Sequence, residues 1–199
     1  LVFDAKKPIS CYRFSKDLSE NSKLIVINGV SKQYAMTGFR IGWAIANKKI
    51  VAAMTNIQGH QTSGPSVLLQ QAAAGALNGL QSGVENLRQT LENNRNVMMA
   101  YLKAFEGVKV ARPDGTFYCF ADFSAYEKNS NKLSEFLIDK VQVVAVPGAE
   151  CGVEGYLRLS YCGAVKDITE GIERMKWALD PNAPSELFIG DRKLIRDWS

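Results

Sequence analysis

A polar, glycine-containing loop, SKQYAMTGFRIG (Ser31–Gly42), separates two short apolar runs. The run before it is KLIVIN (Lys23–Asn28), which is closed by Asn28-Gly29, and the run after it is IGWAIA (Ile41–Ala46). Short β-branched runs bounded by turn residues are typical of buried strands. The pattern therefore predicts two strands joined by a loop, and such loops often carry functional residues on a rigid scaffold.

Three helices are predicted after the second strand. Apolar residues recur at helical spacing from Lys48 to Gln58. The segment Thr62–Pro65 is expected to cap a second helix, because proline suits a first turn and the residues that follow are good helix formers. A longer apolar stripe runs from Val84 to Phe105 and predicts a third helix, which Gly107 can end.

Beyond Gly107 the pattern changes to that of an α+β unit. We expect two strands, VKVA (108–111) and TFYCFADF (116–123), around the turn Arg112–Gly115. A helix near Leu133–Lys140, a strand at Val143–Val146 and a strand at Tyr156–Tyr161 are expected to follow. The last predicted helix is stopped by Asp180-Pro181. Residues 182–199 have weak periodicity and are expected to form an arm or a lid.

The composition is that of an ordinary globular protein. The chain has 199 residues, 46% of them hydrophobic and 22% charged, and its net charge of +4 is spread without long blocks of one sign. We therefore expect no nucleic-acid partner. The apolar runs are too short to cross a bilayer, and the start LVFDAKKPIS is unlike a signal peptide, which predicts a cytoplasmic protein without membrane association. That start also lacks an initiator Met, which suggests a cut chain.

The four cysteines show no CxxC spacing, and His60 is the only histidine. A mixed Cys/His metal site is therefore not expected, and the cysteines are interpreted as reduced thiols that behave as small apolar residues. A Ser/His or Cys/His catalytic pair would have to use His60, which has no supporting partner spacing.

The loop Ser31–Gly42 strongly resembles the lysine signature of class I aminotransferases of fold type I, in the aspartate aminotransferase group. In that family the lysine corresponding to Lys32 forms a Schiff base with pyridoxal 5'-phosphate and later moves a proton on the substrate. The arginine corresponding to Arg40 binds the cofactor's phosphate. The resemblance thus implies Lys32 as the catalytic residue, and Lys32 and Arg40 as cofactor-binding residues.

The residue types suit these roles. A lysine attacks an aldehyde only as the neutral amine, so such a site must favour deprotonation through partial burial or nearby positive charge. Arg40, eight residues away, can supply charge and a forked set of donors for a phosphate dianion. Gly38 and Gly42 are expected to allow close backbone approach.

A second match lies downstream, where Val146–Gly148 is followed by GYLRLSY (Gly155–Tyr161). This resembles the small-domain segment of the same family, whose arginine, here Arg158, grips the substrate's α-carboxylate. A planar guanidinium can pair both carboxylate oxygens and so fix the orientation of the substrate.

Two weaker matches lie between these anchors. DGTFY (Asp114–Tyr118) resembles a strand entry that shapes the substrate side of the family's pocket, although a plain hairpin explains it as well. Thr62–Pro65 lies where relatives approach the cofactor phosphate across the dimer interface, and ordinary helix capping explains it nearly as well.

The resemblance implies an α/β fold: residues 1–88 would be the end of the large cofactor-binding domain, and residues 89–199 the small C-terminal α+β domain. It implies an aminotransferase that acts on an L-amino acid and a 2-oxo acid, with aspartate and 2-oxoglutarate as the default pair, and a homodimer. In relatives the aspartate that pairs with the cofactor's pyridine nitrogen lies upstream of the position of Leu1. We therefore expect the 199-residue chain alone to be inactive.

Three alternatives remain open at this point. The lysine loop is shared with pyridoxal-phosphate-dependent carbon–sulfur β-lyases and with aminocyclopropane-carboxylate-synthase-like enzymes. Aminotransferase-like folds also serve as non-catalytic effector domains of transcription regulators. The chain could, finally, be a dimerisation unit left by proteolysis.

Overall fold

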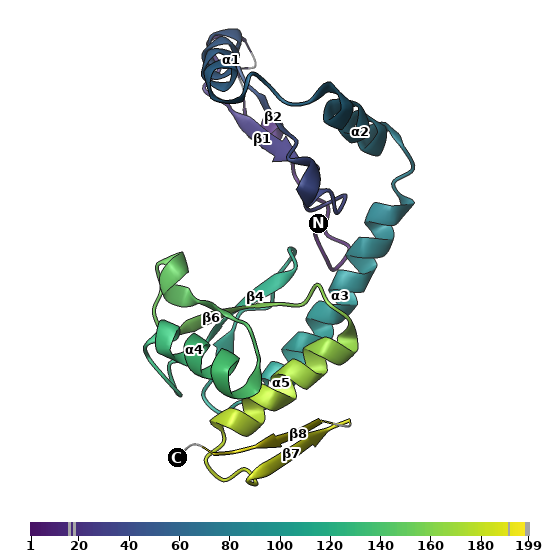
Figure 1. Cartoon of the computed structure of the whole chain (residues 1–199). Coiled ribbons are helices and arrows are strands. Elements are labelled where there is room, and N and C mark those ends of the chain that lie inside the picture. The colour runs from purple at the N-terminus through teal and green to yellow at the C-terminus, as the bar shows by residue number, and fades with distance from the viewer. Residues whose placement is uncertain (16, 18, 191, 198–199) are drawn as a thin grey trace. The chain divides into compact units, whose positions relative to one another are not determined.

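The computed structural model describes residues 1–15, 17, 19–190 and 192–197. The chain divides into two compact units, shown with their elements in Figure 1. Unit 1 comprises Leu1 and Ala5–Arg88, and unit 2 comprises Val2–Asp4 and Gln89–Ser199.

Unit 1 is built on an antiparallel pair of strands, β1 (Val26–Gly29) and β2 (Gly42–Ile45), in which Gly29 lies opposite Gly42. The other elements of this unit are η1 (Cys11–Phe14), η2 (Thr37–Phe39), α1 (Lys48–Thr62), α2 (Val67–Asn78) and the first turns of α3 (Ser82–Leu102). Both predicted strands and the three predicted helices are thus present, with shifted ends.

The ends of α1 follow from local hydrogen bonds. The Asn47 side chain accepts a hydrogen bond from the backbone N–H of Ile50 at 3.0 Å, which caps the first turn. Ser63 ends the helix in the left-handed conformation (φ 57°). The prediction that Thr62–Pro65 caps α2 is wrong, because Thr62 and Ser63 end α1, and the N-cap of α2 is Ser66, whose side chain makes no capping bond.

Helix α3 buries Leu91, Met98 and Leu102 but ends at Leu102, before the predicted Phe105. Beyond Leu102 the chain continues in turns of the 3₁₀ type, in which Ala104 N–H donates to Tyr101 O and Phe105 N–H donates to Leu102 O. Phe105 remains buried in unit 2, where its ring packs edge-on against the Phe123 ring, with ring centres 5.5 Å apart.

Unit 2 contains a four-stranded antiparallel sheet in the order β3-β4-β6-β5. Its strands and the helices that follow them are β3 (Lys109–Val110), β4 (Tyr118–Asp122), α4 (Ser130–Val141), β5 (Val146–Pro147), η3 (Gly148–Cys151), β6 (Tyr156–Ser160) and α5 (Val165–Leu179). Helices α4 and α5 cover one face of the sheet (Figure 1), and Leu157 and Leu159 of β6 are buried on that face. Arg158, between them, points to the other face.

Two predicted segments of unit 2 differ from the structure. The strand predicted at Val143–Val146 is reduced to Val146–Pro147, because Gln142 ends α4 in the left-handed conformation and Val144 is 77% exposed. The arm or lid expected over residues 182–199 is, in its described part, a hairpin of β7 (Glu186–Ile189) and β8 (Arg192–Ile195). Residues 191, 198 and 199 of that expectation lie outside the described part.

Val2–Asp4 is attached to unit 2 by a buried arginine. The side chain of Arg95 is fully buried, and it donates to both carboxylate oxygens of Asp4, at 2.7 and 2.8 Å, and to Pro113 O at 2.8 Å. Its guanidinium carbon lies 4.8 Å from the ring centre of Phe3, which is also fully buried. This arrangement satisfies a buried charge with a bidentate ion pair and a carbonyl.

Along the described residues, no helix combines the length and the apolar character that a membrane span requires.

Candidate functional site

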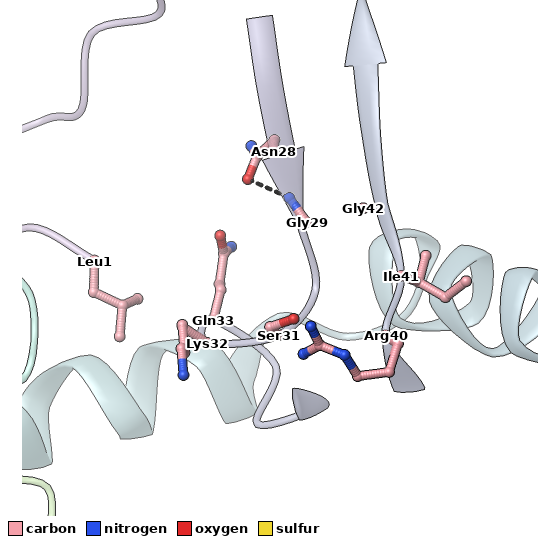
Figure 2. A pocket seen from close by; sticks show the side chains of 9 residues that line it. All are labelled: Leu1, Asn28, Gly29, Ser31, Lys32, Gln33, Arg40, Ile41 and Gly42. Carbon is pink, nitrogen blue, oxygen red and sulfur yellow. Dashed lines mark hydrogen bonds between the residues drawn. The ribbon is translucent and has the colours of Figure 1, made fainter. Parts of the chain in front are cut away.

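The pocket that contains Lys32 and Arg40 lies in unit 1, at the end of β1 and β2. Its volume is about 520 Å³, and both predicted cofactor residues line it together with Ser31, Asn28 and Gln33 (Figure 2). The structure therefore places Lys32 and Arg40 on the same pocket, as their position in one loop suggests. Ser31 was not singled out from the sequence, although its hydroxyl next to the lysine is a group that can donate to a phosphate.

Two buried residues close the base of the lysine loop. Val30 is fully buried and Ile41 is 8% exposed, and the N–H of Val30 donates to Ile41 O at 3.3 Å. Both pack against Ala73 of α2, and Leu69 of α2 lies against the same cluster. Burial of these side chains on both sides of the loop fixes its two ends, so the residues between them extend from a rigid base.

The loop between these ends is a series of tight turns. Tyr34 N–H donates to Val30 O at 3.2 Å, and Ala35 N–H donates to Lys32 O at 3.4 Å. The hydroxyl of Tyr34 donates to Gln81 Oε1 at 2.9 Å, which ties the loop to the start of α3. Lys32 thus sits in a turn whose backbone is held at several points, while its side chain is exposed.

Arg40 ends the 3₁₀ helix η2 in a left-handed conformation, with φ 51° and ψ 41°. For a residue other than glycine this conformation costs roughly 1–2 kcal/mol, and such backbones cluster at functional sites. The guanidinium donates to Thr37 O at 3.3 Å. Figure 2 shows the guanidinium pointing toward Ser31, whereas the Lys32 amine points away from it, so a single ligand would reach the two cations from different sides.

The glycines that bound this loop differ in their role. A Cβ on Gly42 would lie 3.0 Å from Asn28 O, and a Cβ on Gly29 would lie 3.0 Å from Ile41 O. Close approach is thus confirmed at Gly42, and it also occurs at Gly29. At Gly38 the expectation is wrong, because no atom lies within 4 Å of such a Cβ.

Arg158, the third predicted site residue, belongs to unit 2. It is half-buried on β6, opposite Phe120 of β4 and Val146 of β5. Its guanidinium carbon lies 5.1 Å from the ring centre of Tyr118, within the range of a cation–π interaction. Tyr118 ends the segment DGTFY, in which Thr116 has a left-handed backbone with φ 70°.

The cysteines depart in part from expectation. All four are thiols, but only Cys119 is buried, and Cys11, Cys151 and Cys162 are exposed. Burial raises the pKa of the Cys119 thiol to about 11. Across the described residues, no group of three or more His, Cys, Asp or Glu side chains is arranged to hold a metal ion.

Comparison with known proteins gives a consistent result. The family model described as aminotransferase class I and II matches residues 1–175. The probable aspartate/prephenate aminotransferase of Rickettsia bellii is 35% identical over 188 residues, which are 89% of this chain and 47% of that protein. The aspartate aminotransferase of Bacillus sp. (strain YM-2) is 36% identical over 180 residues, which are 88% of this chain and 45% of that protein. The chain thus spans about half the length of these curated relatives.

Solved structures agree with the sequence comparison. The aspartate aminotransferase from Rhizobium meliloti matches with a TM-score of 0.82 and 28% identity, over 89% of this chain and 46% of that one. The aromatic aminotransferase from Pyrococcus horikoshii OT3 matches with a TM-score of 0.81 and 31% identity, over 88% of this chain and 47% of that one. The mixed α/β architecture described above is therefore also found in part of these proteins.

Proposed function

Because this chain belongs to the aminotransferase class I and II family, we propose that it carries the lysine loop and the carboxylate-binding arginine of a pyridoxal-5'-phosphate-dependent aminotransferase. The protein would transfer an amino group between an L-amino acid and a 2-oxo acid. The observation that carries the proposal is that Lys32 and Arg40 line one pocket, on a loop whose ends are fixed by the buried residues Val30 and Ile41. The split between Arg88 and Gln89 supports the assignment of residues 89–199 to the small domain and of Ala5–Arg88 to the large domain, whereas Val2–Asp4 belongs to unit 2.

The residues of the pocket fit the cofactor. Its volume of about 520 Å³ is in the range of small-molecule sites, and it offers one amine, one guanidinium and the hydroxyl of Ser31. Lys32 would hold the cofactor's aldehyde end covalently, and Arg40 and Ser31 would hold its phosphate dianion. When bound, the cofactor supplies a carbonyl group that accepts the amino group and a ring that withdraws electrons from the substrate's Cα.

The chain's own residues would divide the remaining work. The Lys32 amine, once released from the cofactor, would remove the proton from the substrate's Cα and return it during transfer. Arg158 would pair with the α-carboxylate and so fix how the Cα–H bond is directed. Aspartate with 2-oxoglutarate is the substrate pair that we favour. The relatives from Rickettsia bellii and from Bacillus sp. (strain YM-2) are named as a probable aspartate/prephenate aminotransferase and as an aspartate aminotransferase, respectively.

Homodimeric assembly and a cytoplasmic location are part of the same proposal and rest on the resemblance and the sequence features. We also propose that the 199-residue chain does not transaminate by itself. Assay of the purified chain with several amino acids, pyridoxal phosphate and 2-oxoglutarate tests this, and robust turnover would contradict it.

The test of the cofactor assignment is borohydride reduction of the chain after incubation with pyridoxal phosphate, followed by peptide mapping. We expect a yellow chain whose reduced label is on Lys32, loss of that label in K32A, and at least tenfold weaker cofactor binding in R40Q. K49A is the matched control, because Lys49 is an exposed lysine of α1 outside the pocket. Label spread evenly over the lysines, or unchanged in K32A, would refute the assignment.

A further inference from the structure

The face of the unit 2 sheet that is not covered by α4 and α5 carries Arg158 among aromatic side chains. Alternation along β4 and β6 places Tyr118, Phe120, Tyr156 and Arg158 on this face, because their neighbours Cys119 and Leu157 are buried on the other. The rings of Phe120 and Tyr156 pack against each other with centres 4.8 Å apart. Phe120 is also the direct cross-strand partner of Arg158.

Tyr118 contacts the guanidinium itself. The Arg158 guanidinium carbon lies 5.1 Å from the centre of the Tyr118 ring, and the Phe117 ring packs edge-on against the Tyr118 ring, also with centres 5.1 Å apart. Tyr118 is 36% exposed, so solvent or a ligand reaches this pair. A π-face attracts a cation but offers no hydrogen-bond acceptor in the plane of the guanidinium, so it restricts that group without occupying its N–H donors.

Among the described residues of unit 2, Arg95 and Arg158 both lie over an aromatic ring, but they differ in their hydrogen-bond acceptors. Arg95 donates to both oxygens of Asp4 and to Pro113 O. Within the described part of unit 2, the half-buried side chain of Arg158 makes no ion pair and donates no hydrogen bond, and its guanidinium lies over the Tyr118 ring. A half-buried guanidinium with an aromatic ring and no acceptor is suited to receive an external carboxylate.

We propose that Tyr118 is a positioning residue that holds the guanidinium of Arg158 by a cation–π contact, so that its donors are presented to the substrate's carboxylate. This inference rests on the proposed function, because it assumes that Arg158 binds a carboxylate. The phenol hydroxyl has no part in it, so phenylalanine at position 118 serves equally well and leucine does not. Without the ring, Arg158 samples more rotamers, and binding has to order it.

The test uses the 15N-labelled 199-residue chain, with the Arg158 Nε–Hε NMR signal identified by its loss in R158K. Without ligand, we expect this signal to carry a ring-current shift that is kept in Y118F and lost in Y118L. With maleate as the dicarboxylate probe, we expect the Kd to rise about three- to tenfold in Y118L and to stay within about twofold in Y118F. The Nε–Hε signal of Arg95 reports in the same spectra that unit 2 remains folded.

F188L is the matched control, because the Phe188 ring makes a comparable cation–π contact on the β7–β8 hairpin. There the Lys193 Nζ atom lies 5.6 Å from the centre of the Phe188 ring. It should leave both the Arg158 signal and the Kd unchanged. If wild type and Y118L bind maleate equally well, the role of Tyr118 is overturned. The same holds if the Arg158 Nε–Hε signal without maleate is identical in the two proteins. If maleate leaves the wild-type Arg158 signal unmoved, the substrate role of Arg158 fails, and the role of Tyr118 fails with it.

Discussion

Gly29 and Gly42 lie opposite each other at the end of the β1–β2 pair from which the lysine loop extends. A methyl group on either would meet a backbone carbonyl oxygen at 3.0 Å, Ile41 O for Gly29 and Asn28 O for Gly42. Backbone oxygens of paired strands have little room to shift, in contrast to the end of a flexible side chain. The absence of side chains at these two positions is thus part of what holds the base of the loop together.

The first prediction concerns this base. G42A should lower the free energy of unfolding of unit 1 by about 1–2 kcal/mol, because the added methyl overpacks against Asn28 O. G38A is the control, since a Cβ there has no atom within 4 Å, and it should change the stability by less than about 0.5 kcal/mol. Urea unfolding followed by circular dichroism measures both, and an equal loss in the two variants would contradict the prediction.

The second prediction concerns the acid stability of unit 2. The hydrogen bond from Arg95 lowers the pKa of Asp4 from its ordinary 3.8 to about 2, with the charges of Arg95 and Arg112 adding to the effect. A depressed pKa in the folded state means that this contribution to stability is complete above about pH 4 and is lost as the pH falls through about 2. D4N should therefore be less stable than wild type at neutral pH.

The difference between wild type and D4N should then shrink steadily between pH 4 and pH 2. Thermal melts across this range measure it. D139N is the control, because Asp139 is an exposed residue of α4, and it should track wild type at every pH. A difference between wild type and D4N that stays constant down to pH 2 would show that the ion pair is not its source.

The third prediction counts reactive thiols. In the native chain at pH 8, a thiol reagent such as Ellman's reagent should modify the exposed Cys11, Cys151 and Cys162 rapidly. Cys119 should react only after denaturation, because burial hides it and raises its pKa to about 11. C119A should leave the rapid phase of the reaction unchanged and should abolish the additional thiol that reacts when the chain is denatured in guanidinium chloride. Rapid reaction of a fourth thiol in the native chain would be incompatible with this structure.

The fourth prediction concerns Thr116, a β-branched residue held at φ 70°. Asparagine tolerates this left-handed conformation better, so T116N should stabilise unit 2 by up to about 1 kcal/mol. T116V keeps the branched Cβ and should bring no gain. The Tm of unit 2 measures both changes, and a T116N variant no more stable than T116V would argue against strain at this position.

Local sequence patterns account well for the helices and for the lysine loop. The last helix, α5, shows this, because the apolar residues Ile168, Ile172 and Met175 recur at helical spacing in the sequence and all three are buried in the structure. Lys32 and Arg40 lie in one short loop. Their presence on the same pocket can therefore be predicted from the local sequence, without knowledge of contacts between distant residues. Their roles stay predictions, and so does that of Arg158.

The features that sequence did not predict depend on distant residues or on broken alternation. Asp4 and Arg95 are 91 positions apart, and no local spacing indicates their ion pair. The sequence does not predict the β7–β8 hairpin, because the apolar residues Phe188 and Ile195 stand at exposed positions and disrupt the polar–apolar alternation that marks a half-buried strand. Val143–Val146 shows the converse, since β-branched residues suggested a strand longer than the one that the end of α4 allows.

The β1–β2 pair has a practical consequence for anyone who produces this chain. Among the described strands, β1 and β2 pair only with each other, so the outer edge of each carries backbone N–H and C=O groups that no described strand takes up. Ile27 of β1 is 76% exposed, and Leu80, just after α2, is 94% exposed. Overexpression in bacteria should therefore drive much of the polypeptide into inclusion bodies, and a charged substitution such as I27K should raise the recoverable yield.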